Sequence, residues 1–227
     1  MPKMQPPLPL LLDGADHPFE ADLYLPENPW GAVIFGGAWR LDPGFVTAML
    51  EALVSSRLAV LAPRFGGLSG QEEPWDSGYQ LRQLGAASRW LAHEKWTGGL
   101  AQGLFASGPL AAPALRLAAE PPPPLQAVMI FEGSAEMSDV DLEEVRVPTL
   151  FVAEGGDPLD AELHEAVAQM LRCESRLILL DQALVPPRAA VGWYVDHFKA
   201  YYRGSSPLPY PVRLRGLLSL PMTELAQ

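Results

Sequence analysis

A serine within a strand–turn–helix pattern is the first candidate for chemistry in this chain. Ser107 follows the apolar residues 100–106 and precedes an alanine- and leucine-rich segment that ends at Glu120. An apolar run that passes through small residues into such a segment predicts a buried strand, a tight turn and a packed helix. An elbow of this kind can hold a nucleophile in a strained backbone conformation.

The register of the predicted helix decides which residue occupies the reacting position. That position falls on Gly108, one residue after Ser107, so Ser107 is the candidate nucleophile that the elbow itself offers. We expect Gly108 to have a positive φ, and we expect the regular helix to begin near Ala112 with Pro113 in its first turn. The register follows from the helix positions that would be buried, namely Ala111, Ala114, Leu115 and Ala118.

Three other predicted strand ends carry residues that suit the same chemistry. Gly36, Gly37 and Ala38 lie at the end of one strand, and their backbone N–H groups can approach an oxyanion or form only a tight turn. Asp157 follows another strand, where it can orient a histidine or cap the helix that begins at Pro158. The loop 181–185 follows the last strand, and it contains no histidine that could act as a general base.

An alternation of strands and helices must position these groups. Further apolar strands are expected at residues 21–26, 32–37, 58–63, 126–132, 149–154 and 176–180, and helices at 77–96, 158–171, 188–202 and from Asp42-Pro43 onward. We expect strands 21–26 and 32–37 to pair, joined by the turn at 26–29. The alternation predicts an α/β fold, a three-layer α/β/α sandwich with a mostly parallel sheet. Ligands bind at the carboxyl ends of the strands in such sheets.

Composition limits the classes of partner. The 227 residues, of which 48% are hydrophobic, suit a single domain 1–227 with a core at about 20–202 and a proline-rich tail at 203–227. A net charge of −11 argues against nucleic acid or an anionic membrane as a partner. Cys173 is the single cysteine, which suits a reducing cytoplasm, and no run reaches the roughly 20 apolar residues of a membrane span.

Metal and cofactor sites are not predicted. The acidic group Glu72, Glu73 and Asp76 lacks the ligand spacing of a calcium loop, and the glycine-rich residues 66–70 lack the lysine of a phosphate-binding loop. Three of the four histidines are expected away from the elbow, with His164 pointing to solvent or to a neighbouring helix, and no location is predicted for His17. The four are His17, His93, His164 and His197.

The motifs together resemble those of α/β-hydrolases of the dienelactone hydrolase-like type, over roughly residues 20–202. Residues 35–39 are similar to the His-Gly-Gly-x-Trp oxyanion loop, with Phe35 at the histidine, and residues 103–115 resemble the elbow, with Gly108 at the serine. Residues 147–157 resemble the strand that leads to the triad acid, which is Asp157, and residues 181–185 resemble the histidine segment, with Val185 at the histidine. The resemblance implies this fold and, for the family, hydrolysis of an ester or lactone.

Two functions remain open. One is a non-catalytic binding or interaction module with a small-molecule ligand, in which the triad serine and histidine have been lost. The other is an unorthodox hydrolase of a small ester or lactone that uses Ser107 and Asp157 with a base from a loop, the tail or another subunit. The tail has an apolar patch at 212–220, which either packs across the domain or joins a homo-oligomer.

Overall fold

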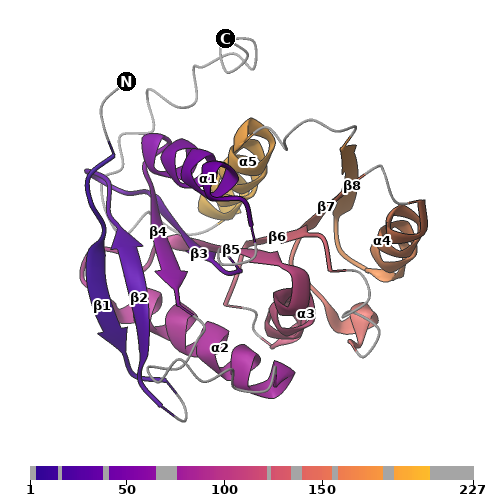
Figure 1. The fold of residues 1–227 in the computed structure, drawn as a ribbon, viewed down its shortest axis with the longest axis horizontal. Coiled ribbons are helices and arrows are strands. Elements are labelled where there is room, and N and C mark those ends of the chain that lie inside the picture. The colour runs from indigo at the N-terminus through magenta and orange to yellow at the C-terminus, as the bar shows by residue number, and fades with distance from the viewer. Residues whose placement is uncertain are drawn as a thin grey trace.

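The computed structural model describes residues 4–14, 17–37, 41–64, 76–121, 124–133, 140–154, 158–180 and 187–204. In these ranges the strands form one eight-stranded sheet in the order β1-β2-β4-β3-β5-β6-β7-β8 (Figure 1). β2 runs antiparallel to β1 and β4, and the other pairs are parallel. The bounds are β1 Leu8–Leu12, β2 Phe19–Tyr24, β3 Gly31–Phe35, β4 Leu58–Pro63, β5 Ala101–Ser107, β6 Ala127–Phe131, β7 Thr149–Glu154 and β8 Ser175–Leu180.

Helices cover both faces of the sheet. Helices α1 (Pro43–Ser55) and α5 (Pro187–Gly204) pack on one face, and α2 (Ser77–His93), α3 (Ala111–Ala119) and α4 (Pro158–Met170) pack on the other (Figure 1). Each face has its own hydrophobic cluster, because strands with helices on both sides bury alternate side chains in opposite directions. The predicted three-layer α/β/α sandwich is confirmed.

The first helix forms as its sequence predicts. The Asp42 carboxylate accepts a hydrogen bond from the Phe45 N–H at 3.0 Å, and Pro43 occupies the first helical position. The buried positions of α1 recur at helical spacing and face the sheet. They are Phe45, Met49, Leu50 and Leu53.

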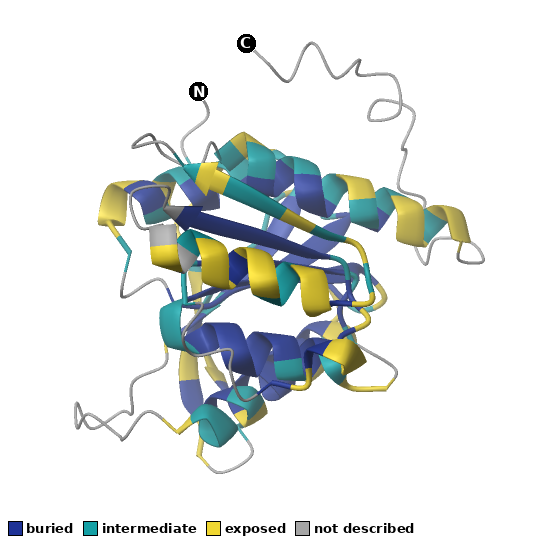
Figure 2. Cartoon of the chain, turned by 90° about the vertical axis from the view of Figure 1, so that its right-hand side faces the viewer, coloured by how far each residue is buried: buried dark blue, intermediate teal, exposed yellow. Residues whose placement is uncertain are grey.

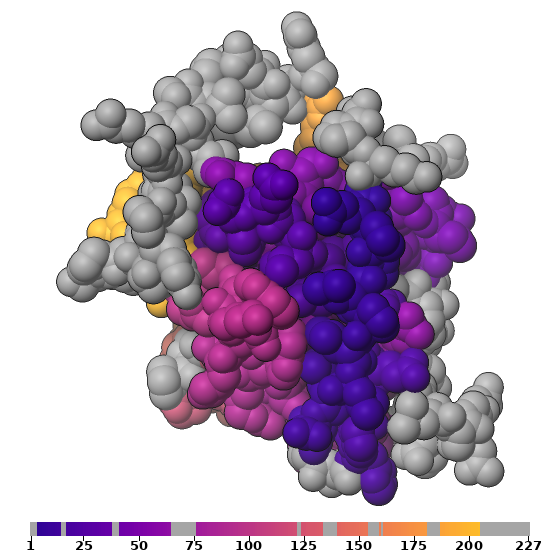
Figure 3. Space-filling view, turned by 90° about the vertical axis from the view of Figure 1, so that its left-hand side faces the viewer, coloured from indigo at the N-terminus to yellow at the C-terminus, as the bar shows by residue number. Residues whose placement is uncertain are grey.

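The predicted pairing of strands 21–26 and 32–37 is wrong. β4 lies between β2 and β3 and pairs with both of them. The connection through α1 brings β4 alongside β3 in parallel, so the other side of β4 is left for β2. The structure also contains β1, a strand that the sequence analysis did not predict, at the outer edge of the sheet. Figure 3 faces this edge and shows α2 beside it.

The C-terminal helix closes the edge at which the parallel strands begin. The Tyr202 hydroxyl donates to the Trp30 carbonyl at 2.7 Å and accepts from the Ala101 N–H at 2.9 Å. Burial raises the pKa of this phenol from its ordinary value of 10 to about 12, so the donor proton stays in place well into the alkaline range. α5 is therefore tied to the starts of β3 and β5. Among the described helices, none has the length and apolar character needed to cross a bilayer.

Candidate functional site

The chain turns sharply between β5 and α3. Gly108 begins a short 3-10 helix, η2 (Gly108–Leu110), and has φ +53°, so the predicted positive φ is confirmed. The α-helix begins at Ala111, which puts Pro113 in its first turn and confirms the predicted late start to within one residue. A proline is tolerated there because first-turn N–H groups have no partner within the helix.

Ser107 is the last residue of β5, and its hydroxyl points into the protein. The side chain is 1% exposed, and Oγ donates to the Gly37 carbonyl at 3.2 Å. Gly37 has φ +91°, and a Cβ built on it would lie 2.1 Å from this oxygen. The predicted oxyanion loop and the predicted nucleophile therefore meet, but they meet in a hydrogen bond that occupies the hydroxyl proton.

The backbone on the β3 side of this contact is held on β5. The Gly36 N–H donates to the Phe105 carbonyl at 2.8 Å, which extends the strand pairing beyond Phe35. The rings of Phe35 and Phe105 stack with centroids 4.4 Å apart. Both rings are fully buried, so an aromatic stack lies where the resemblance places a polar histidine. Ala38 lies outside the described residues.

Two residues at the end of β6 complete the turn, and neither was among the predicted site residues. Glu132 has φ +59°, which is uncommon for a residue with a side chain, and its N–H donates to the Val152 carbonyl at 3.0 Å. A Cβ on Gly133 would lie 2.4 Å from the Gly108 carbonyl oxygen, so the two turns are in contact. An acid followed by a glycine directly after a buried strand was the available signal.

Aromatic rings line the same end of the sheet on the α1 face. The Phe131 ring lies 5.1 Å from Phe45 and 6.4 Å from Phe105, measured between centroids. Phe45 is 9% exposed and Phe131 is 8% exposed, whereas the rings of Phe35 and Phe105 are closed to solvent. The surroundings of the turn are thus apolar on this face.

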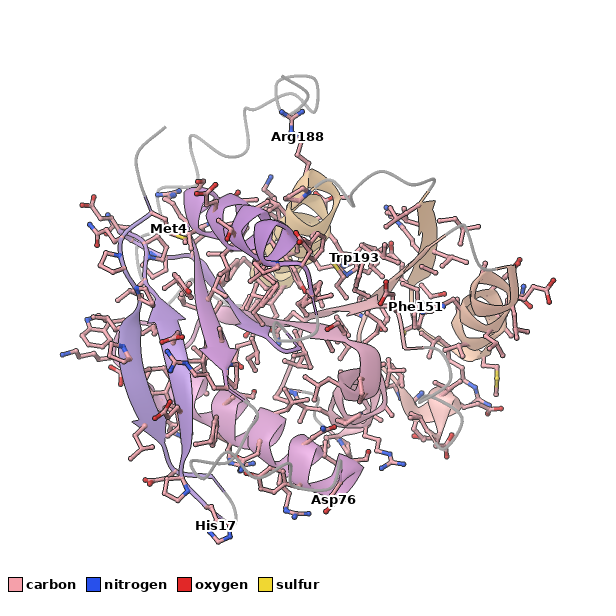
Figure 4. All side chains as sticks on the ribbon, in the orientation of Figure 1. Met4, His17, Asp76, Phe151, Arg188 and Trp193 are labelled. Atoms are coloured by element: carbon pink, nitrogen blue, oxygen red, sulfur yellow. The ribbon has the colours of Figure 1, made fainter. Side chains whose placement is uncertain are left out.

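The histidines are not gathered at the turn. His17 is exposed at the tip of the β1–β2 hairpin (Figure 4), and His93 is exposed at the end of α2. His197 is half-buried with its ring centroid 4.1 Å from that of Trp193. The resemblance places the triad histidine at Val185 and the triad acid at Asp157. Both positions lie outside the described residues.

The prediction for His164 is wrong. Its side chain is fully buried, and its ring packs edge-on against Phe151 of β7 with the ring centroids 6.0 Å apart. α4 covers β7 and β8, and position 164 lies on the face of the helix that meets β7. Within the described ranges, no three His, Cys, Asp or Glu side chains come together as a group that could hold a metal ion.

Solved structures share this arrangement of strands and helices. A dienelactone hydrolase from Anabaena variabilis superposes with a TM-score of 0.73 over 85% of this chain and 99% of its own, at 23% identity. An esterase domain from a Rhodothermus marinus protein has a TM-score of 0.64 at 19% identity, over 87% of this chain and 98% of its own. A serine hydrolase without a lid from Xanthomonas campestris has a TM-score of 0.60 at 18% identity, covering 96% and 97%. The chain has the α/β-hydrolase fold.

Relatives in sequence are more distant. No protein-family model matches the chain. Two Mycobacterium tuberculosis proteins, from different strains and both provisionally named phosphoribosyl transferases, are 24% identical to it over 195 residues. The match covers 79% of this chain and 44% of each relative, so the chain spans less than half the length of these curated proteins. The α/β-hydrolase fold is therefore known at the level of architecture, and the activity is a separate question.

Proposed function

We propose that this α/β-hydrolase-fold chain is a binding or interaction module that does not hydrolyse esters. The observation that carries the proposal is the hydrogen bond from the buried Ser107 hydroxyl to the Gly37 carbonyl. A serine acts as a nucleophile when a general base accepts its proton and its oxygen faces the substrate. Here a backbone carbonyl accepts the proton, and a peptide carbonyl is far too weak a base to remove it.

The turn also supports this proposal on the side of the oxyanion. On a nucleophile elbow, one oxyanion donor is the backbone N–H of the residue that follows the nucleophile. With the nucleophile position at Gly108, the next residue is Pro109, which has no N–H. Removing one such donor typically costs a factor of about 10²–10³ in turnover. The turn thus lacks a nucleophilic hydroxyl at Gly108 and an oxyanion N–H donor at Pro109.

The hydrolase alternative, with Ser107 and Asp157 as catalytic groups, needs more rearrangement. Ser107 would have to break its bond to Gly37 and rotate out of a site in which it is 1% exposed. We therefore place it second. We assign no transferase activity to this chain, because more than half of each relative with that name lies outside the matched region.

The class of ligand follows from the lining of the turn. Phe45 and Phe131 offer apolar rings at its rim, and the chain's net charge of −11 argues against polyanions, so we propose a small apolar or aromatic molecule. We further propose one domain in which the elements from β1 to α5 act together, and a cytoplasmic protein, since Cys173 is a free thiol.

Turnover of p-nitrophenyl acetate by the full chain tests the proposal. We expect a rate no higher than that of the denatured chain, with the Ser107→Ala variant indistinguishable from wild type. Turnover well above the denatured control that disappears in Ser107→Ala would instead establish the hydrolase alternative. Loss of turnover in Asp157→Asn as well would identify its acid.

A further inference from the structure

Helix α4 presents an apolar stripe to solvent. Leu159, Leu163 and Met170 are 65%, 40% and 54% exposed, and Ala166 between them is also exposed. Their spacing of four, three and four residues places all of them on one side of the helix, opposite the side that covers β7 and β8. Figure 2 looks onto this side of the molecule and shows the exposed positions along α4. A stripe at this spacing is the surface against which a second apolar segment packs.

The stripe has a charged border. Glu162 and Glu165 are both exposed and lie along one side of it, and the Glu165 carboxylate accepts a hydrogen bond from Gln169 at 3.4 Å. In an antiparallel symmetric pair of these stripes the acidic borders of the two copies would meet, and this like-charge contact disfavours that pair. An occupant with basic residues beside its apolar ones fits the border better.

The sequence after α5 has this character. Residues 205–227 contain Arg213 and Arg215 and a single acid, Glu224, in a chain whose net charge is −11. Apolar residues adjoin the two arginines at helix-compatible spacing, before Pro221. They are Leu214, Leu217 and Leu218. We propose that residues 212–220 dock on the α4 stripe of the same chain. In a helix Arg213 and Arg215 lie on opposite sides of these leucines, so one of the two arginines faces Glu162 and Glu165.

The connecting length permits this. Tyr202 is bonded at the starts of β3 and β5, and α4 ends at Met170 ahead of β8, so both helices end at the same edge of the sheet. The path between them crosses three strand spacings and two layers, about 25 Å in all. Residues 205–211 contain prolines at alternate positions, and an extended proline-rich segment of this length spans about 20 Å. The remaining distance of about 5 Å is covered when the first two residues of the segment 212–220 are also extended.

Hydrogen exchange of the full chain, followed by mass spectrometry on peptides from 212–220, tests the proposal. We expect amides of this segment to exchange at least about tenfold more slowly than in a synthetic peptide of residues 205–227. In Leu163→Lys the rates should return to within about twofold of the peptide, and Glu162→Lys with Glu165→Lys should act in the same direction. Leu11→Lys is the matched control, because Leu11 is 63% exposed at the opposite edge of the sheet, and it should leave the protection unchanged.

Three results would overturn the proposal. The first is exchange of 212–220 at the peptide rate in the wild-type chain. The second is protection that persists in Leu163→Lys, which would place the segment on another surface. The third is protection that falls on dilution together with dissociation of a dimer in sedimentation, which would assign the stripe to a second copy. None of these outcomes depends on whether the chain hydrolyses esters.

Discussion

Ser107 and Gly37 are joined across the candidate site by a hydrogen bond of 3.2 Å from the serine Oγ to the glycine carbonyl. The bond connects the end of β5 to the loop after β3, which are distant in sequence. It makes the serine a structural element of the turn, and this role has measurable consequences for stability.

Ser107→Ala should destabilise the protein. The substitution leaves the Gly37 carbonyl without this donor in a buried place, which costs about 1–2 kcal/mol. Urea denaturation measures the change as a lower midpoint. Thr47→Ala is the control, because the Thr47 hydroxyl bonds to the Pro43 carbonyl on the exposed side of α1 and should matter by less than about 0.5 kcal/mol. An unchanged midpoint in Ser107→Ala would show that the bond does not form in solution.

Gly37→Ala should be more costly, and the cost should depend on Ser107. The new Cβ would lie 2.1 Å from the serine Oγ, and the residue would keep an unfavourable φ of +91°. Removing the hydroxyl relieves the first problem and leaves the second. The double variant Gly37→Ala with Ser107→Ala should therefore lose less stability than the two single losses added together. Strict additivity in a double-mutant cycle would contradict the contact.

Gly108→Ala should lower the stability of the protein by about 1 kcal/mol, because alanine is strained at φ +53°. Gly192→Ala is the control, and it should raise the stability. Gly192 lies within α5, and nothing is within 4 Å of a Cβ built there, so alanine should stabilise that helix by up to about 1 kcal/mol. Thermal unfolding of the two variants should shift in opposite directions. A shift of Gly108→Ala to higher temperature would mean that the turn adopts a different backbone in solution.

Restoring a triad alone should not restore hydrolysis. Gly108→Ser with Val185→His supplies a nucleophile and a base, yet Pro109 still offers no N–H to the oxyanion. We expect this double variant to remain at background with p-nitrophenyl acetate. Adding Pro109→Ala should give the first measurable turnover, by a factor of up to about 10² over the double variant. Equal rates for the double and triple variants would show that Pro109 is not the missing donor.

His197 should make stability fall in mild acid. Burial lowers its pKa below the ordinary value of 6.5, although Glu174 and Asp196 oppose the shift. The unfolded chain then binds a proton more readily than the folded one, so stability is lost as the pH falls through about 6.5. His197→Phe keeps a ring against Trp193 and removes the titration. Midpoints in urea at about pH 7.5 and 5.5 should therefore differ less in this variant than in wild type. Identical differences would rule out this contribution.

The sequence was sufficient for the elements whose patterns are local. α1 could be predicted from a cap, a proline and an apolar stripe, and the late start of α3 from Pro113, because each depends on neighbours within one or two turns. The position of β4 between β2 and β3 could not be predicted from local patterns. Strand pairing depends on where the crossover through a helix places the next strand in the sheet. β1 was missed because Pro9 within it, and Pro6 and Pro7 just before it, disguise an edge strand.

The candidate site divides in the same way. The identity of Gly108 and its positive φ follow from spacing and small residues. The bond from Ser107 to Gly37 does not, because no local pattern tells which way a serine at a strand end turns its hydroxyl. Glu132 and Gly133 were passed over because their importance comes from contact with a turn on the neighbouring strand.

The Tyr202 hydroxyl bridges groups that are 101 and 172 residues earlier in the chain. During synthesis the sheet strands therefore leave the ribosome well before the helix that covers Trp30 and closes their starting edge. Until α5 emerges, the apolar face that it buries is open to chaperones and to other nascent chains. A stop codon just after Gly204 would leave this closure intact. One placed shortly before Tyr202 would remove only a few more residues and yet leave the protein prone to aggregation.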